Sequence, residues 1–306
     1  MKKLLVATVS AAVLVALASC GGGDDGPKLS RSDLDRVRSD PRVVSAAGIV
    51  ERADTLLIPA AHFDLTITAQ GQTESGQVHA RGSCAGIRCI LSAEGERLTV
   101  TLDDLLAPGG ADEDFTRIDL GRRGGFNTAF VEGQDRLSEH MVGGLITVRP
   151  TTRAHAFWGE WGYAGTATLL GPFSGRSQGT SFRGRLDGTL SFAVGDVTGY
   201  NPRDVGSATW TGVSEAVSTR TYERRAGTAT VHIPDLSTPR VNVYVDVAGY
   251  AIGTSAWDGI PIYRGRYAAG ISGRDRLVGN FHGPNHEETY GVFDTGAYVG
   301  AFGASR

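Results

Sequence analysis

Ser177 stands in a pattern that is typical of catalytic serines. Residues 175–179 read Gly-Arg-Ser-Gln-Gly, and in a Gly-x-Ser-x-Gly turn the serine is exposed as a nucleophile between a buried strand and a helix. Here Gly171 and Pro172 precede the pattern, and residues 180–186 alternate like a strand. A chain with 43 glycines is expected to contain such a match by chance. We therefore predict no catalytic residue and no enzymatic activity.

Two histidines and two glutamates near the C-terminus offer possible metal ligands. They follow one another as His282, His286, Glu287 and Glu288, an order that differs from the His-Glu-x-x-His helix of zinc hydrolases. Residues four apart share one face of a helix but do not share one in a strand-turn-strand segment. We predict a structural turn here, with no metal site and no cofactor.

Cys84 and Cys89 are the two cysteines that follow residue 20. Four residues separate them, so they do not match the Cys-x-x-Cys spacing of redox motifs, and no second cysteine pair completes a zinc site. In an oxidising compartment a close pair most simply forms a disulfide that closes a tight turn. We predict this disulfide, with a redox or metal-binding pair as the alternative.

The densest aromatic cluster lies at residues 157–163, which read Phe-Trp-Gly-Glu-Trp-Gly-Tyr. Aromatic side chains contribute much of the energy of protein–protein interfaces. Trp158, Trp161 and Tyr163, together with Trp257, are therefore the candidate partner-binding residues. The alternative is that these side chains are buried between two domains.

The N-terminus has the pattern of an export signal. Lys2 and Lys3 precede an apolar run, residues 4–17, that is shorter than a membrane-spanning helix requires. The run ends in Leu-Ala-Ser before Cys20, which resembles the bacterial lipobox. This resemblance implies that residues 1–19 are a cleaved signal peptide and that lipid is attached to Cys20. Residues 20–30 would then be the lipidated cysteine and a flexible tether.

The charge balance argues against nucleic acid as a partner. The chain has 30 Lys and Arg against 33 Asp and Glu, and loss of Lys2 and Lys3 with the signal leaves 28 against 33, a net charge of −5. Surfaces that bind nucleic acid are basic. No later segment reaches about 18 consecutive apolar residues, so we expect membrane attachment through lipid. Gly21 replaces the aspartate that marks inner-membrane retention in enteric bacteria, which favours the outer membrane.

The hydrophobic pattern predicts a mainly β chain after a short N-terminal helix. Residues 32–38 begin with a plausible helix cap before Pro41 interrupts, and residues 43–53 form a second helical candidate. Beyond residue 60 the apolar residues alternate in short runs that glycines separate. The predicted strands cover residues 63–68, 97–102, 145–148, 163–169, 189–194, 208–213, 227–233, 241–247, 260–267, 277–282, 290–293 and 298–302.

Two C-terminal motifs carry a family resemblance. Residues 279–293 read Gly-Asn-Phe-His-Gly-Pro-Asn-His-Glu-Glu-Thr-Tyr-Gly-Val-Phe, and residues 300–306 read Gly-Ala-Phe-Gly-Ala-Ser-Arg. They resemble the closing strands of the barrel domain of transferrin-binding protein B, which recurs in factor H binding protein and related surface lipoproteins. His282 replaces the usual tyrosine, and Tyr290 stands where glycine is commoner. The resemblance implies an eight-stranded antiparallel β-barrel over residues 201–306, after an irregular β-rich handle-like domain over residues 31–200.

The resemblance does not supply a ligand, because one fold serves several functions. We predict an outer-membrane lipoprotein, with the cell surface or the periplasm as its side, that binds a protein or an iron- or haem-carrying ligand without catalysis. Loops at one barrel end would form the contact surface, and Tyr263 is an aromatic residue of these loops. The alternative is a structural or assembly lipoprotein of the envelope with the barrel as an inert module.

Overall fold

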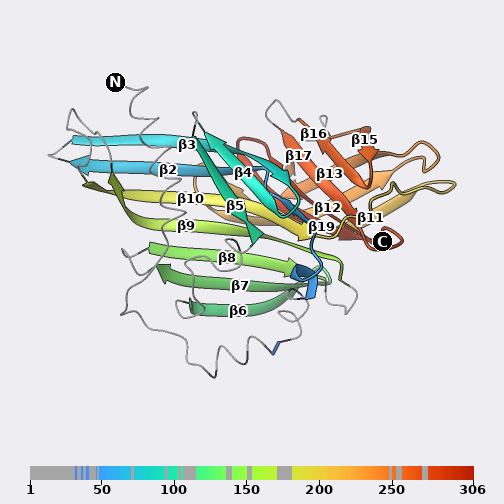
Figure 1. Ribbon diagram of the computed structural model, residues 1–306, viewed down its shortest axis with the longest axis horizontal. Helices are drawn as coiled ribbons and strands as arrows, with labels where there is room; N and C mark the ends of the chain where they lie inside the picture. The colour runs from blue at the N-terminus through green and yellow to red at the C-terminus, as the bar shows by residue number, and fades with distance from the viewer. Residues whose placement is uncertain are drawn as a thin grey trace.

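The computed structural model is built almost entirely of antiparallel β-strands in two sheets (Figure 1). It describes residues 32, 36, 39–40, 46, 48–69, 72–93, 96–102, 105, 115–135, 140–149, 154–170, 181–247, 250–252, 257–270 and 275–306. Residues 46 and 48–50 are helical and lie in the second predicted helical stretch. Within the described ranges, no helix has the length and apolar character needed to cross a membrane.

The N-terminal sheet, here called sheet A, is a broad layer in which most strands pair with their neighbours in sequence. The order is β5-β4-β3-β2-β10-β9-β8-β7-β6, and β1 pairs with β10. The two longest strands, β9 and β10, lie side by side near the middle of the layer (Figure 1). The strands are β1 (Thr55–Leu57), β2 (Ala60–Ala69), β3 (Gln72–Ala85), β4 (Arg88–Ala93), β5 (Glu96–Thr101), β6 (Phe115–Arg123), β7 (Phe126–Asp135), β8 (His140–Val148), β9 (Ala156–Leu170) and β10 (Ser181–Gly195).

The C-terminal strands close into the predicted eight-stranded antiparallel barrel. The order β12-β11-β19-β18-β17-β16-β15-β13 returns to its start because β12 also pairs with β13, and β14 adds to β13. Closure leaves no unpaired edge in the ring. The strands are β11 (Ala208–Ser218), β12 (Arg224–Ile233), β13 (Arg240–Val247), β14 (Tyr250–Ile252), β15 (Ile260–Tyr263), β16 (Arg266–Ala269), β17 (Arg276–His282), β18 (Glu288–Asp294) and β19 (Tyr298–Ser305).

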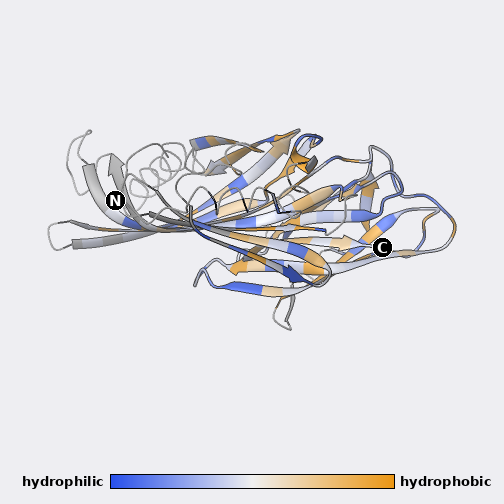
Figure 2. Ribbon diagram, turned by 90° about the horizontal axis from the view of Figure 1, so that it is seen from below, coloured by the Kyte–Doolittle hydropathy of each residue, from blue (hydrophilic) through white to orange (hydrophobic). Residues whose placement is uncertain are grey.

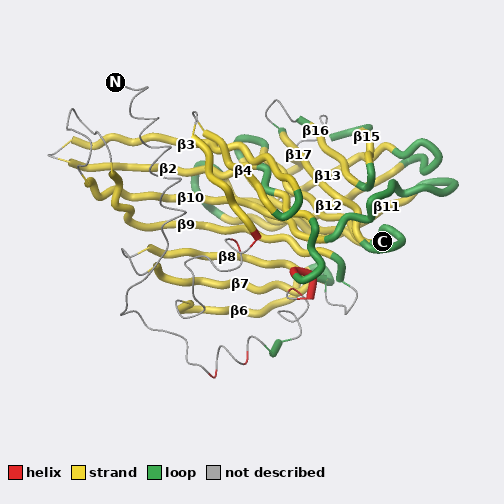
Figure 3. The backbone as a smooth tube through the Cα atoms, viewed as in Figure 1, coloured by secondary structure: helices red, strands yellow, loops and turns green. Residues whose placement is uncertain are grey.

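Most strand predictions from the hydrophobic pattern are confirmed, because alternation marks strands with one face on a core. The tube in Figure 3 shows how little of the described chain is helix. Residues 260–267 differ from the prediction, since they form two strands joined at Arg264 and Gly265. Both residues have positive φ, 51° and 76°, which is the geometry of a two-residue hairpin turn with the twist that antiparallel strands require.

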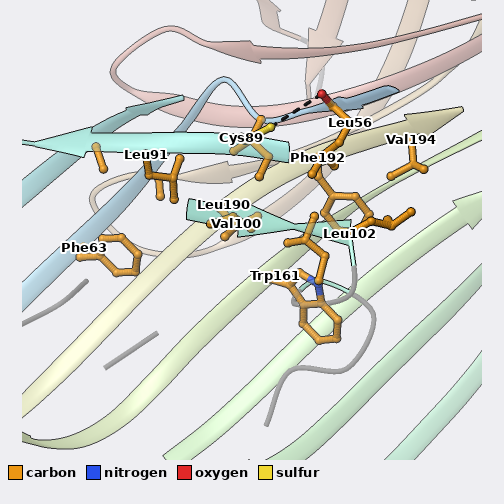
Figure 4. Close-up of a cluster of buried hydrophobic side chains, with 14 of the residues drawn as sticks. Leu56, Phe63, Cys89, Leu91, Val100, Leu102, Trp161, Leu190, Phe192 and Val194 are labelled. Carbon is orange, nitrogen blue, oxygen red and sulfur yellow. Dashed lines mark hydrogen bonds between the residues drawn. The ribbon is translucent and has the colours of Figure 1, made fainter. Parts of the chain in front are cut away.

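Each sheet has its own hydrophobic core. In sheet A, Phe63, Leu91, Trp161 and Phe192 point into one cluster (Figure 4). In the barrel, alternate residues of β12 and β13 point inward to a cluster that contains Trp257, which is fully buried. Colouring by hydropathy shows the same alternation along the strands (Figure 2).

A third cluster joins the two sheets, and Trp158 lies in it. On β9, Phe157 and Trp161 face the core of sheet A, whereas Trp158 packs with barrel residues such as Tyr290 and Ala301. Gly303 makes this approach possible, because a Cβ there would lie 2.6 Å from the indole Nε1 of Trp158. The C-terminal Gly-Ala-Phe-Gly motif therefore does two things: its phenylalanine fills the barrel, and its last glycine admits a side chain of sheet A.

Charged side chains also cross between sheet A and the barrel. Arg123 of β6 pairs with Glu215 of β11 and donates to the carbonyl oxygen of Ser214 (3.1 Å). Arg224 of β12 lies 3.3 Å from Glu160 of β9, whose side chain is fully buried. These contacts join side chains of sheet A to the barrel at two places, Arg123 with Glu215 and Arg224 with Glu160.

The predicted disulfide is present. Cys84 and Cys89 are opposite each other in the β3–β4 hairpin and are bonded through their sulfurs. The backbone N–H of Ile58 donates to Sγ of Cys84 (3.2 Å), so the bridge also contacts the segment between β1 and β2.

Replacing both cysteines with serine (C84S/C89S) is expected to lower the free energy of unfolding by about 2 kcal/mol, the chain-entropy estimate for so short a loop. Urea unfolding of the full chain in detergent would measure it. A reducing agent should destabilise the unaltered chain by a similar amount and leave the double variant unchanged. Equal free energies of unfolding for the oxidised parent and the double variant would show that the bridge contributes nothing to stability.

Candidate functional site

Several chain segments meet at one end of the barrel and surround a groove. They are the connection from β10 to β11, the β15–β16 turn, the β17–β18 turn and the C-terminal residue. We call this concave space of about 740 Å³ the rim groove. It is lined by Gly199, Tyr200, Asn201, Arg203, Asp204, Tyr263, Arg264, Pro284, Asn285, His286 and Arg306.

Tyr200 forms one wall and is held in place by the β17–β18 turn. Its hydroxyl donates to the carbonyl oxygen of Pro284. The ring of His286 packs edge-on against it, with centroids 4.7 Å apart, and Nε2 of His286 contacts the backbone oxygen of Tyr200 (3.0 Å). Burial lowers the pKa of His286, so its ring is neutral at neutral pH. About half of Tyr200 (52%) nevertheless remains exposed.

The β15–β16 turn also lines the groove and presents Tyr263 and Arg264. Asn201 fixes this turn, because its amide donates to the oxygen of Ile262 (2.8 Å) and its side-chain oxygen accepts from the N–H of Gly265 (3.0 Å). Tyr263 is 70% exposed, and the guanidinium of Arg264 lies over its ring at 5.4 Å. Glycine, asparagine and aspartate are the usual residues with positive φ, and Arg264, like Tyr222 and His286, adopts it without being one of them.

Arg306 completes the lining at the end of the chain. Its N–H donates to the oxygen of Glu287 (3.1 Å), and its guanidinium lies over the ring of Trp210 at 5.2 Å. The indole N–H of Trp210 in turn donates to the oxygen of His286 (2.6 Å). Tyr200, His286 and Arg306 are therefore held in place by other parts of the chain, which reduces the entropy cost of binding.

The charges of the lining are mainly positive. The lining contains three arginines, Arg203, Arg264 and Arg306, and one carboxylate, Asp204. A second hollow of about 390 Å³ shares Asn201, Arg203 and Asp204 with the groove and adds Arg240. The whole chain carries a net charge of −3, so this basic region differs from the average surface. Exposed tyrosines beside arginines are typical of protein-binding sites.

The structure corrects the predicted set of partner-binding residues. Trp158, Trp161 and Trp257 are 1%, 8% and 0% exposed, and Tyr163 is half-buried beside the core of sheet A. The indoles pack where sheets and barrel need large apolar side chains, so they cannot form a contact surface. For Trp158, the alternative of burial between the two parts of the chain describes what the structure shows.

The histidines and glutamates of the β17–β18 region do not converge on a common point. Nδ1 of His282 contacts the oxygen of Asp196, and burial lowers the pKa of His282 to about 4. Glu287 accepts from the backbone N–H of Asn285 (3.0 Å), whereas Glu288 accepts from the N–H of His155 (3.0 Å). These side chains build the turn and attach it to sheet A. Cys20 and Ser177 lie outside the described residues.

Comparison with solved structures gives low-identity matches over most of the chain. A transferrin-binding protein B from Actinobacillus pleuropneumoniae H49 is 11% identical, with 81% of this chain and 99% of that chain covered and a TM-score of 0.37. The isotype 1 protein from serogroup B Neisseria meningitidis is 10% identical, with 83% and 76% covered and a TM-score of 0.29. A protein of unknown function from Nostoc punctiforme is 10% identical, with 82% and 95% covered and a TM-score of 0.25.

These likenesses concern the fold alone, at 10–11% identity and with TM-scores of at most 0.37. A scan against models of protein families finds no match, and a search of curated proteins finds no relative. The motifs that resemble transferrin-binding protein B lie on β17, β18 and β19 and in the turn that lines the rim groove.

Most of the rim groove could not be located from the sequence. Tyr263 was an expected loop aromatic, but Tyr200 and Arg203 lie in a connection without a recognisable pattern. The β15–β16 turn was the one part of the groove with a local sequence signal. The segment Tyr-Arg-Gly-Arg at 263–266 sits between two short apolar runs, where a two-residue hairpin turn was possible.

Proposed function

We propose that this chain is a lipid-anchored protein of the bacterial outer membrane that binds a partner protein through the rim groove. The lipobox-like segment before Cys20 supports the anchor, and the groove supports binding without catalysis. An iron- or haem-carrying protein is one such partner. The remaining 31–200 segment would serve as a rigid handle that holds the barrel away from the tether.

One observation carries this proposal. Among the described residues, five large hydrophobic side chains are exposed, and three of them, Tyr200, Val205 and Tyr263, lie in the two segments that border the groove. Isolated exposed apolar residues are ordinary, but a group around a concavity marks an interaction site. The positive lining favours a partner that presents an acidic segment, since complementary charge speeds encounter and fixes orientation.

Site-specific photocross-linking in growing cells would test the proposal. A photoreactive benzoylphenylalanine placed at Tyr263 is expected to give one dominant adduct of defined mass. The same group at Tyr244, which is 42% exposed on the barrel wall, serves as the matched control and should give little adduct.

Equal adducts at both positions, or no adduct at Tyr263 in cells that make the protein normally, would contradict binding at the groove. Mass spectrometry of the adduct then separates a soluble partner from an envelope component.

A further inference from the structure

Two histidines of sheet A meet one aspartate of the barrel away from the rim groove. His62 on β2 and His79 on β3 are paired in the register of the hairpin, and their rings stack with centroids 4.3 Å apart. Asp294 ends β18. Its Oδ1 lies 3.1 Å from Nε2 of His62, and its Oδ2 lies 2.8 Å from Nε2 of His79.

This arrangement has the donor atoms of a metal site. The three side chains offer ligand atoms that all lie within 4.8 Å of one another. Imidazole nitrogen and carboxylate oxygen are common ligands of zinc and other divalent transition metals. With metal–ligand bonds near 2.0–2.2 Å, neighbouring ligands of a tetrahedral ion stand about 3.3–3.6 Å apart. To hold an ion, the two carboxylate–imidazole contacts would lengthen slightly, and any ligand pair near the 4.8 Å limit would move closer together.

The three side chains would hold an ion that solvent can still reach. His62 and Asp294 have side chains only 11% and 7% exposed, whereas the side chain of His79 is 42% exposed and provides a route from solvent. The N–H of Gly296 donates to Oδ1 of Asp294 (2.8 Å), which orients the carboxylate in the way that hydrogen bonds to metal-binding side chains do. Arg276, which also interacts with Asp294, donates to the oxygen of Pro59 (2.9 Å) rather than to the carboxylate.

We propose that His62, His79 and Asp294 bind one divalent transition-metal ion, with Zn²⁺ as the probe, and that the ion links sheet A to the barrel. Water would complete the coordination on the side of His79. No sequence motif indicates this site, because His79 and Asp294 are 215 positions apart in the chain. The inference is independent of the rim groove and of the proposed partner.

Zinc titration of the full chain in detergent tests the proposal. The protein is prepared without a histidine tag, stripped with a chelator and titrated by calorimetry near pH 7.5. One Zn²⁺ per chain is expected, with at least tenfold weaker binding after His79→Ala and after Asp294→Asn. His232→Ala is the matched control, because His232 lies on β12 and contacts Thr209 instead.

Cobalt gives a second readout that a change in folding would not imitate. Co²⁺ in place of Zn²⁺ should produce the visible absorption of a four-coordinate site, and His79→Ala should abolish it. Because His79 is partly exposed, its replacement is expected to leave the folded core intact. His79→Ala therefore tests metal binding even if Asp294→Asn fails to fold. Absence of stoichiometric Zn²⁺ binding, or equal affinity in the parent and in His79→Ala, would overturn the proposal.

Discussion

A chain with serine in place of Cys20 is expected to appear wholly in the soluble fraction of lysed cells, and the unaltered chain is expected to stay with the outer membrane. Each buried methylene of an acyl chain contributes about 0.8 kcal/mol, and one acyl chain alone binds only marginally. Two or more acyl chains on Cys20, as the proposed function requires, would make release negligible. The hydroxyl of serine cannot accept a thioether-linked lipid, so Cys20→Ser would remove the proposed anchor.

Fractionation and mass measurement of the N-terminal peptide check this expectation. The double variant C84S/C89S is the matched control, because it changes the other two cysteines of the chain and should remain in the membrane fraction. An unaltered chain that carries no acyl mass, or a Cys20→Ser chain that stays in the membrane fraction, would remove the tether from the proposed function.

Glu160 is expected to make the stability of the protein fall as pH rises from about 5 to 8. Burial raises the pKa of Glu160 to about 8, although Arg224 acts in the opposite direction. Oε2 of Glu160 and Nε of Arg224 lie 3.3 Å apart, but neither atom forms a hydrogen bond in the part of the chain that the structure describes. Ser191 lies 3.5 Å from Oε1. The pairing therefore does not offset the desolvation of the carboxylate.

The direction of the effect follows from proton binding. Between the ordinary pKa, 4.5, and about 8 the folded chain keeps a proton on Glu160 that the unfolded chain has lost. The stability from this group is present below the lower value and is lost as pH rises through the higher one. This difference in pKa corresponds to at most about 5 kcal/mol in the free energy of unfolding. Glu215 is a second buried carboxyl nearby, and burial raises its pKa also, against Arg123 and Arg224.

Replacement of Glu160 by glutamine separates this effect from the other ionisable groups. Glu160→Gln resembles the protonated acid, so urea unfolding should find equal stability near pH 5 and a variant more stable by a few kcal/mol near pH 8.5. Arg224 keeps its position over the ring of Phe130 (5.3 Å). Glu223→Gln, in an exposed pair with Arg225, should change stability little at either pH. A Glu160→Gln chain that is less stable than the parent at pH 8.5 would instead indicate a favourable ion pair.

The strands were predictable because they depend on local patterns, whereas the closed barrel was expected from the family resemblance of the C-terminal motifs. Alternation in β13, such as Val241, Val243 and Val245, assigns one face to the interior without knowledge of any partner. The disulfide between Cys84 and Cys89 was predictable for a similar reason, since five positions separate its cysteines. The last glycine of the C-terminal motif was recognisable, although its contact with Trp158 was not.

The contacts between the two sheets depend on residues that are distant in sequence. Trp158 and Trp161 are three positions apart, yet β9 turns one toward the barrel and the other toward the core of sheet A. An aromatic cluster alone cannot distinguish these neighbours from an exposed patch. The same holds for Glu160 with Arg224 and for His79 with Asp294, because β-pairing and packing, rather than spacing, bring them together.

Cross-linking at Tyr263 in charge-reversed chains tests most directly whether the rim groove holds the partner. With the photoreactive group at Tyr263, the changes Arg203→Glu and Arg306→Glu together are expected to reduce the adduct at least tenfold. Arg220→Glu, on the exposed turn at the other end of the barrel, should leave it unchanged. An adduct that survives reversal of both groove arginines, at the yield of the Arg220→Glu control, would contradict recognition of an acidic partner by this groove.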